Sequence, residues 1–258
     1  MSELQMLLQA VEEVARATGD EAMRHYRGEI EVNIKRDGSP VTNADLSAER
    51  VARDWIMKRF PADGILGEEF GVHNGDADRR WIIDPIDGTA SFARGVPLWG
   101  TLVAAARGDE VLAGAVYCPA ADEMVCAARS EGSWWNGSRT RVSATDDLSR
   151  AVVLTTDARF AASPEKLPRL HALIAEAGSC RGWGDCFGYV MVATGRADVM
   201  VDPVMSPWDA AALLPVIEEA GGVFTDWTGQ PTAFGGDAIA TNAALSRVVR
   251  GKLCGASS

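Results

Sequence analysis

The stretch WIIDPIDGT at residues 81–89 constrains the fold of this chain more than any other. Its apolar start is typical of a buried strand, yet it leads directly into Asp84 and, after two more residues, into Asp87. Two carboxylates this close repel one another unless a cation lies between them. We therefore expect a strand whose last residues form part of a cation-binding site.

Three further acids stand where the chain gives them no evident structural task. Glu68 follows the apolar stretch GIL, Asp45 lies at the head of a predicted helix, and Asp209 begins another. Alone, each is explained by a solvated turn or a helix start, where acids are common. Together with Asp84 and Asp87 they favour a site for Mg²⁺, which prefers hard oxygen ligands. The three histidines lack the helical spacing of a zinc site; they are His25, His73 and His171.

The residues after Asp87 form a predicted anion site. Gly88 permits close approach of the backbone, and N–H groups at a turn leading into a helix attract phosphate oxygens. The Thr89 hydroxyl is able to orient or deprotonate a water, with Glu68 as the neighbouring carboxylate. Ligands for metal ions, a cradle for phosphate and a positioned water together indicate a metal-assisted phosphomonoester hydrolase.

The hydrophobic periodicity changes near residue 150. Before it, the pattern predicts a helix over 3–26, a charged turn over 35–40, a helix from Thr42 or Asn43 to Phe60, short strands at 64–67 and 81–84, and turn-linked strands over 101–129. After it, the pattern predicts strands at 151–156 and 197–203, helices at 163–178, 185–197 and 207–221, and a strand and turn over 221–229. We expect an α+β fold with an N-terminal part over 1–145, carrying most metal ligands, and an α/β part over 146–258, carrying Asp209 and the leaving-group contacts.

Charge and composition disfavour several classes of function. The 258 residues are 47% hydrophobic and 24% charged, which is ordinary for a globular protein. A net charge of −11 disfavours nucleic-acid binding by bulk electrostatics. The five cysteines show no disulfide framework, the acid-containing start is unlike a secretory signal, and no apolar run approaches the ~18 residues of a membrane span. We expect a cytoplasmic protein without a membrane or nucleic-acid partner.

Three segments resemble the signatures of the inositol monophosphatase superfamily. They are GEE at 67–69, WIIDPIDGTASF at 81–92 and PWDAAA at 207–212, in the same order along the chain. The resemblance implies a layered α-β-α-β-α sandwich, a homodimer, and hydrolysis of a small phosphorylated metabolite. It also implies two or three Mg²⁺ ions, with Mn²⁺ as a substitute and Li⁺ as an inhibitor.

The resemblance assigns roles to individual residues. The metal ligands it implies are Glu68, Asp84, the carbonyl of Ile86, Asp87 and Asp209. Glu68 and Thr89 are implied to activate the attacking water, and Asp45 is a further candidate catalytic acid. The implied contacts to phosphate and substrate are Asp87, Gly88, Thr89, Ala90 and Asp209. The family's acid three residues before the threonine of V-T-x-x-D is replaced here by Ser39, with Asp37 nearby, so this ligand of a weaker third ion is in question.

The leaving-group side favours an alcohol that carries an ammonium group. Asp185 follows a glycine where inositol phosphatases tend to have a small or hydroxyl residue, and Asp202 stands where they bind the ring. Two acids there suit a cation, because charge-assisted hydrogen bonds are stronger than neutral ones. FARGVPLW at 92–99 and the segment around Asp185 are similar to histidinol-phosphate phosphatases of the inositol-monophosphatase-like type. Arg94 is a candidate substrate contact or a loop charge, and Trp183 is a candidate aromatic contact.

Several alternatives remain open at this point. Asp185 is also well placed to cap the helix that follows it. Inositol 1-phosphate is the second candidate substrate, and fructose bisphosphate or a phosphoadenosine nucleotide are further ones. A regulatory binding module without turnover is the alternative of a different class.

Overall fold

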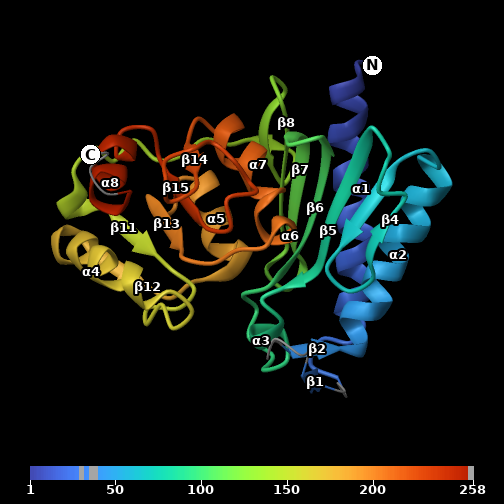
Figure 1. The fold of residues 1–258 in the computed structure, drawn as a ribbon, viewed down its shortest axis with the longest axis horizontal. Helices are drawn as coiled ribbons and strands as arrows, with labels where there is room; N and C mark the ends of the chain where they lie inside the picture. Colours follow the sequence, from blue (N-terminus) through green and yellow to red (C-terminus); the bar gives the residue numbers. More distant parts are fainter. Residues whose placement is uncertain (29–31, 35–39, 255–258) are drawn as a thin grey trace.

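The protein forms five layers in the order α-β-α-β-α, as the resemblance implied (Figure 1). The computed structural model describes residues 1–28, 32–34 and 40–254, with the side chains of 1–28 and 41–254. The charged turn predicted over 35–40 lies outside the described residues except for Pro40, and so do Asp37 and Ser39.

An eight-stranded sheet is the second layer and carries most of the site. Its strand order is β10-β9-β8-β7-β6-β5-β3-β4. The strands are β3 (Gly64–Gly67), β4 (Gly71–His73), β5 (Arg79–Asp87), β6 (Gly100–Arg107), β7 (Glu110–Cys118), β8 (Glu123–Ala128), β9 (Gly132–Trp135) and β10 (Ser138–Arg139). β3 and β5 are parallel neighbours, whereas the other adjacent strands pair antiparallel. The ends of β3 and β5 therefore meet at one edge of the sheet.

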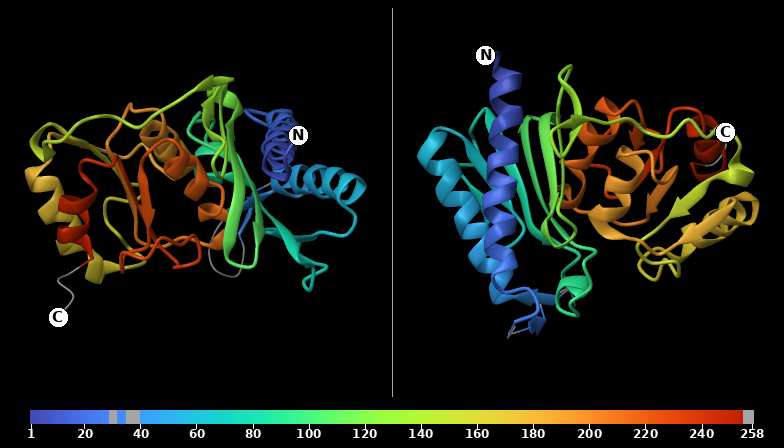
Figure 2. Two further views of the ribbon diagram at one scale, coloured as in Figure 1. Left: turned by 90° about the horizontal axis from the view of Figure 1, so that it is seen from above. Right: turned by 180° about the vertical axis from the view of Figure 1, so that it is seen from behind.

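Helices α1 (Glu3–Met23) and α2 (Asn43–Arg59) form the first layer and cover the outer face of this sheet (Figure 2). Capping boxes at Ser2 and Thr42 start the two helices, so Thr42 is the N-cap and Asn43 the first residue of α2. Their apolar stripes pack on buried sheet residues that include Trp81 and Val103. The short pair β1 (Val32–Ile34) and β2 (Pro40–Thr42) precedes α2, and α3 (Thr89–Phe92) follows β5.

The third layer lies between the two sheets and consists of α5 (Asp185–Ala193), α6 (Pro207–Ala210) and α7 (Leu213–Glu219). The fourth is a five-stranded sheet in the order β12-β11-β13-β15-β14. Its strands are β11 (Val152–Leu154), β12 (Ser179–Arg181), β13 (Val199–Asp202), β14 (Val223–Thr225) and β15 (Ala238–Thr241). The fifth layer is α4 (Leu167–Glu176) and α8 (Ser246–Leu253), and 3₁₀ turns occur at Pro119–Ala121, Leu148–Arg150 and Pro164–Lys166.

The single helix predicted over 207–221 is wrong, because the segment forms two helices, α6 and α7. Pro215 lacks the N–H that would continue the ladder to the preceding turn, so a new helix starts with the proline in its first turn. The chain crosses between the sheets in the segment from Arg139 to Val152, and the predicted division at 145 falls within this crossing. Within the described ranges, no helix is both long and apolar enough to span a membrane.

Candidate active site

A bulge in β5 brings Asp84 and Asp87 onto the same face of the large sheet. Asp84 pairs with Leu102 and Asp87 with Gly100, so β5 holds one residue more than β6 over this span. In a regular strand, residues three apart point to opposite faces, and one extra residue reverses this. Pro85 between them has no N–H to offer to the ladder, which suits an interrupted register.

Glu68 joins Asp84 because β3 and β5 run in parallel and end together. Gly67 pairs with Ile83, and the Glu68 N–H donates to the Ile83 carbonyl over 3.2 Å. Asp84 is 2% exposed. Burial, and then the charge of Glu68 and of two further aspartates, hold the pKa of Asp84 well above its usual range.

The start of α6 supplies Asp209. The Ser206 N–H donates to Asp209 Oδ2 over 2.7 Å, so one carboxylate oxygen is held by the helix's own first turn. Asp45 occupies the equivalent third position of α2, where its Oδ2 accepts from the Thr42 N–H (2.8 Å) and hydroxyl (2.6 Å). Both helix starts therefore fix an acid by one oxygen and direct it toward the end of β5.

The carboxylates of Asp84, Asp87 and Asp209 form a cluster that fits divalent cations. One oxygen of each lies within 4.8 Å of the others. Burial raises the pKa of Asp209 to about 6, and burial with the charges of Asp185 and Asp209 raises that of Asp87 well above its usual range. Such mutual repulsion is relieved by a hard cation with oxygen ligands. The Ile86 carbonyl, which accepts from the Thr89 hydroxyl over 3.0 Å, lies beside the cluster as a further oxygen donor.

The turn after Asp87 has the geometry expected of an anion cradle. Gly88 has a φ of +83°, a conformation that glycine adopts at little cost, and it precedes the first turn of α3. The first N–H groups of a helix, here those of Thr89 and Ala90, have no acceptor within the helix. The Thr89 hydroxyl also lies 3.5 Å from Asp45 Oδ1, so it stands between the cradle and this buried acid.

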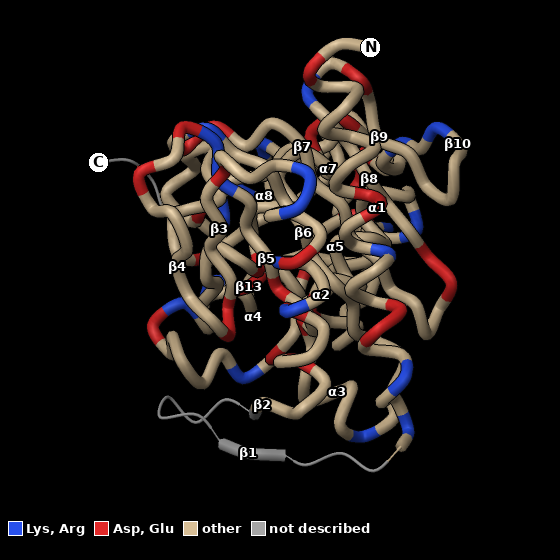
Figure 3. Tube along the Cα trace, turned by 90° about the vertical axis from the view of Figure 1, so that its right-hand side faces the viewer, with Lys and Arg blue, Asp and Glu red and all other residues tan. Residues whose placement is uncertain are grey.

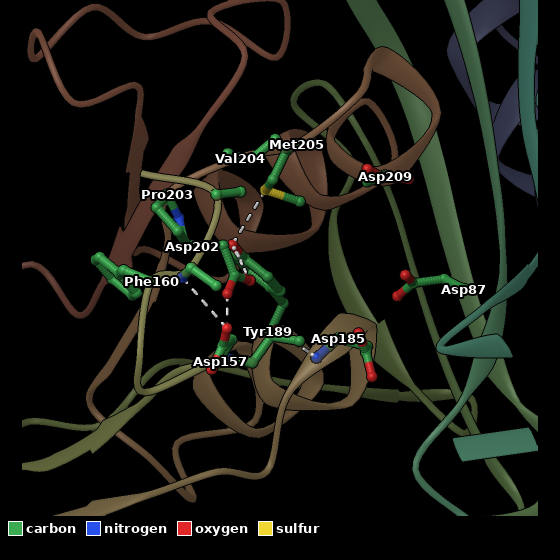
Figure 4. Close-up of a pocket in the computed structure, with 13 residues that line it drawn as sticks. Asp87, Asp157, Phe160, Asp185, Tyr189, Asp202, Pro203, Val204, Met205 and Asp209 are labelled. Carbon is green, nitrogen blue, oxygen red and sulfur yellow. Dashed lines mark hydrogen bonds between the residues drawn. The ribbon is translucent and has the colours of Figure 1, made fainter. Parts of the chain in front are cut away.

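A cavity of about 210 Å³ continues from the cluster into the C-terminal part (Figure 4). In Figure 4, Asp87 and Asp209 lie on one side of the view and Asp202 on the other. The acids that line the cavity are Asp87, Asp157, Asp185, Asp202 and Asp209. Phe160 and Met205 belong to the apolar wall of the cavity. No Lys or Arg is among the described residues that line it, although Lys and Arg are dispersed among Asp and Glu over the trace in Figure 3. The described lining residues therefore bring no positive charge of their own, and Arg159 Nε pairs with Asp157 Oδ1 over 3.2 Å at the edge of the cavity.

Asp202 and Asp185 face this cavity from two different elements. Asp202 ends β13, is 5% exposed, and accepts from the Thr156 N–H (3.1 Å) and the Tyr189 hydroxyl (3.1 Å). Asp185 is the first residue of α5, and burial with the charges of Asp202 and Asp209 raises its pKa to about 7. Gly184 is the N-cap of α5 and no side-chain capping bond is present. The Asp185 carboxylate instead reaches Gly88, where it lies 3.1 Å from the place of a Cβ atom.

Two of the predicted contacts lie elsewhere. Arg94 is exposed, donates to the Ala90 carbonyl over 2.8 Å, and does not line the cavity. Trp183 is 40% exposed and is not a lining residue either. Both side chains are thus solvent-facing in this arrangement.

Glu49 supports the loop beside the site, and the sequence pattern alone did not predict this role. It is fully buried, and its carboxylate accepts from the N–H groups of Glu69 (2.7 Å) and Phe70 (3.2 Å) and from Arg53 Nε (2.7 Å). A Cβ atom at Gly67 would lie 2.0 Å from Glu49 Oε1, so only glycine fits there. Glu49 therefore holds the loop that carries Glu68. Its position four residues after Asp45, on the same helix face, was the available signal.

The site combines carboxylates from the end of β3, from β5 and from α6 with a backbone anion cradle. Within a five-layer α/β frame, this combination defines a metal-dependent phosphomonoesterase. The comparison with known proteins gives the family. The Inositol monophosphatase family profile matches residues 3–256, and the chain belongs to this family.

Individual relatives agree with this assignment. A protein named histidinol-phosphatase from Chlorobaculum parvum is 42% identical over 246 residues, which cover 95% of this chain and 94% of the relative. Another of that name, from Mycobacterium tuberculosis, is 37% identical over 233 residues, or 88% and 90% of the two chains. The solved structure of an inositol monophosphatase from Zymomonas mobilis has a TM-score of 0.87 and 27% identity, and the match covers 98% of this chain and 99% of that one. The protein is thus a phosphoric monoester hydrolase of a metal-dependent family.

Proposed function

We propose that the protein hydrolyses L-histidinol phosphate to L-histidinol and phosphate, a step of histidine biosynthesis, with Mg²⁺ as its ion. The observation that carries this proposal is the leaving-group side of the cavity, where Asp185 and Asp202 occur without a Lys or Arg among the described lining residues. An alcohol with an ammonium group gains charge-assisted hydrogen bonds from these acids. Its imidazole ring finds an apolar wall at Phe160 and Met205. Similarity to two proteins named histidinol-phosphatase supports the same substrate.

The proposed roles follow from the geometry of the cluster. Asp84, Asp87, Asp209, Glu68 and the Ile86 carbonyl would hold the ions. When bound, such ions stabilise charge on the phosphoryl oxygens and make water more acidic.

The remaining groups act on the water and the phosphate. The Thr89 hydroxyl, held between Asp45 and the Ile86 carbonyl, orients the water, and Glu68 accepts its proton. The N–H groups of Gly88, Thr89 and Ala90 bind the phosphate.

A substrate panel tests the proposal. Purified protein is assayed on histidinol phosphate, inositol 1-phosphate, fructose bisphosphate, a phosphoadenosine nucleotide and p-nitrophenyl phosphate, with Mg²⁺ and with a chelator. We expect the highest kcat/KM on histidinol phosphate and no turnover with the chelator. Equal or higher kcat/KM on inositol 1-phosphate would overturn the substrate assignment.

A variant pair sharpens the test. Asp185→Asn is expected to reduce kcat/KM on histidinol phosphate about tenfold more than on p-nitrophenyl phosphate, because only the former carries an ammonium. Asp76→Asn, at an exposed position that belongs to none of the site segments and does not line the cavity, is the matched control. Equal losses on the two substrates for Asp185→Asn would mean a structural role.

We also propose that the enzyme works in the cytoplasm as a homodimer, that Mn²⁺ substitutes for Mg²⁺, and that Li⁺ inhibits. The unpaired state of all five cysteines supports a reducing compartment. Light scattering of the purified protein tests the dimer, and ion titrations of the histidinol-phosphate assay test the metal preferences.

A further inference from the structure

We propose that Thr156 is the positioning residue that sets selectivity for a cationic leaving group, an inference that rests on the proposed function. Thr156 lies two residues beyond the end of β11 and belongs to none of the segments that carry the family resemblance. Two other residues of the cavity, Asp185 and Asp202, depend on it.

Thr156 connects the two acids through separate groups. Its backbone N–H donates to Asp202 Oδ1 over 3.1 Å, and its hydroxyl accepts from the Asp185 N–H over 2.8 Å. Asp202 comes from β13 and Asp185 from α5, so a single residue links the carboxylate of Asp202 to the backbone from which the Asp185 side chain extends.

The Asp185 backbone needs this contact. Its φ of +52° lies in the left-handed region, which costs a residue other than glycine roughly 1–2 kcal/mol. Its N–H opens α5 and has no acceptor within the helix, so the Thr156 hydroxyl supplies one. This conformation brings the Asp185 carboxylate beside Gly88, at the border between the phosphate cradle and the leaving-group side.

The close approach of Thr156 and α5 is built into the sequence. A Cβ atom at Gly184 would lie 2.4 Å from Thr156 Cα, so the glycine before Asp185 is required for the contact. Asp202 is restrained on its other side by the Tyr189 hydroxyl over 3.1 Å. With both oxygens of Asp202 held, the Thr156 hydroxyl is the element that fixes Asp185 relative to it.

Substitution at Thr156 separates this role from folding, because the residue is exposed. Thr156→Val keeps the shape and the backbone N–H to Asp202 but removes the hydroxyl acceptor. Thr156→Ser keeps the hydroxyl and serves as the rescue variant.

The test compares kcat and KM on histidinol phosphate and on p-nitrophenyl phosphate, whose leaving group carries no ammonium. For Thr156→Val we expect kcat/KM on histidinol phosphate to fall about tenfold, mainly through KM, and a loss on p-nitrophenyl phosphate at least fivefold smaller. Thr156→Ser should retain the wild-type ratio between the two substrates.

The outcomes distinguish this inference from the proposed function. If the wild-type protein favours histidinol phosphate and Thr156→Val keeps that preference, the role of Thr156 is overturned and the proposed function stands. Equal losses on both substrates would show a purely structural role and overturn the proposed role of Thr156 as well. Wild-type protein without a preference for histidinol phosphate would overturn both.

Discussion

Replacing Asp209 by asparagine is expected to stabilise the metal-free protein while removing its metal-dependent activity. Folding buries this carboxylate next to other acids and raises its pKa from 3.8 to about 6. An acid whose pKa is raised by folding binds more protons in the folded than in the unfolded state. Its contribution to the free energy of unfolding therefore falls as pH rises from about 4 to about 6, and the loss persists above that range.

The size of the effect follows from the same pKa values. One pKa unit corresponds to about 1.4 kcal/mol, so ionised Asp209 costs the metal-free fold about 3 kcal/mol at pH 8. In Asp209→Asn the side-chain oxygen still accepts from the Ser206 N–H, while the charge is gone. A gain of this size corresponds to a rise in Tm of roughly 6–12 °C for a chain of this length.

Thermal and urea unfolding in a chelator, at pH 8 and at pH 4.5, measure this difference. We expect the advantage of Asp209→Asn to be near its full value at pH 8 and to shrink strongly at pH 4.5. Excess Mg²⁺ should reverse the order, because it binds the wild-type cluster and stabilises that fold. Asp76→Asn, an exposed position, is the control. A variant less stable than wild type at pH 8 in chelator, or an advantage independent of pH, would refute the reasoning.

Three further substitutions probe the support of the site. Glu49→Gln should lower kcat at least tenfold, because a glutamine side chain cannot accept from two backbone N–H groups and an arginine together. The circular dichroism spectrum should not change, and an unchanged kcat would contradict this prediction. Gly88→Ala should cost about 1–2 kcal/mol in urea unfolding and raise KM, since φ is +83° and the new Cβ would lie 3.0 Å from the Leu98 carbonyl; wild-type stability would count against it. Asp45→Asn should reduce kcat about a hundredfold with little change in KM, because the Thr89 hydroxyl loses a carboxylate acceptor. Steady-state kinetics that show an effect on KM alone would refute this prediction.

The sequence predicted the site best where its residues stand at the ends of elements. Glu68 follows the apolar strand β3, Asp84 follows the apolar run of β5, and Asp209 lies in the first turn of an apolar helix. The ends of neighbouring parallel strands such as β3 and β5 lie side by side. Their convergence was therefore readable from local patterns. The layered fold followed from the resemblance, since periodicity alone does not define how two sheets are stacked.

Other features depend on contacts that local patterns do not contain. The left-handed backbone of Asp185 occurs together with a hydrogen bond from its N–H to the Thr156 hydroxyl, which belongs to a segment 29 residues away. An acid four residues before an arginine on a helix usually reads as a solvent-exposed pair, whereas Glu49 is fully buried. β15 went unpredicted because three of its four residues are alanine or threonine, and its burial comes from β13 and β14 on either side. The break at Pro215, by contrast, had a readable signal in the proline itself.

The first turn of α5 gives the enzyme a physical link between two kinds of recognition. In the proposed complex Asp185 faces the departing alcohol, and the N–H of the next residue, Cys186, donates to the Asp87 carboxylate. If the alcohol and the ions bind as proposed, a movement of this peptide unit changes both contacts, and binding of the alcohol is then thermodynamically coupled to binding of the ions. Such coupling is reciprocal: the factor by which the bound alcohol raises the affinity for the ions equals the factor by which the bound ions raise the affinity for the alcohol.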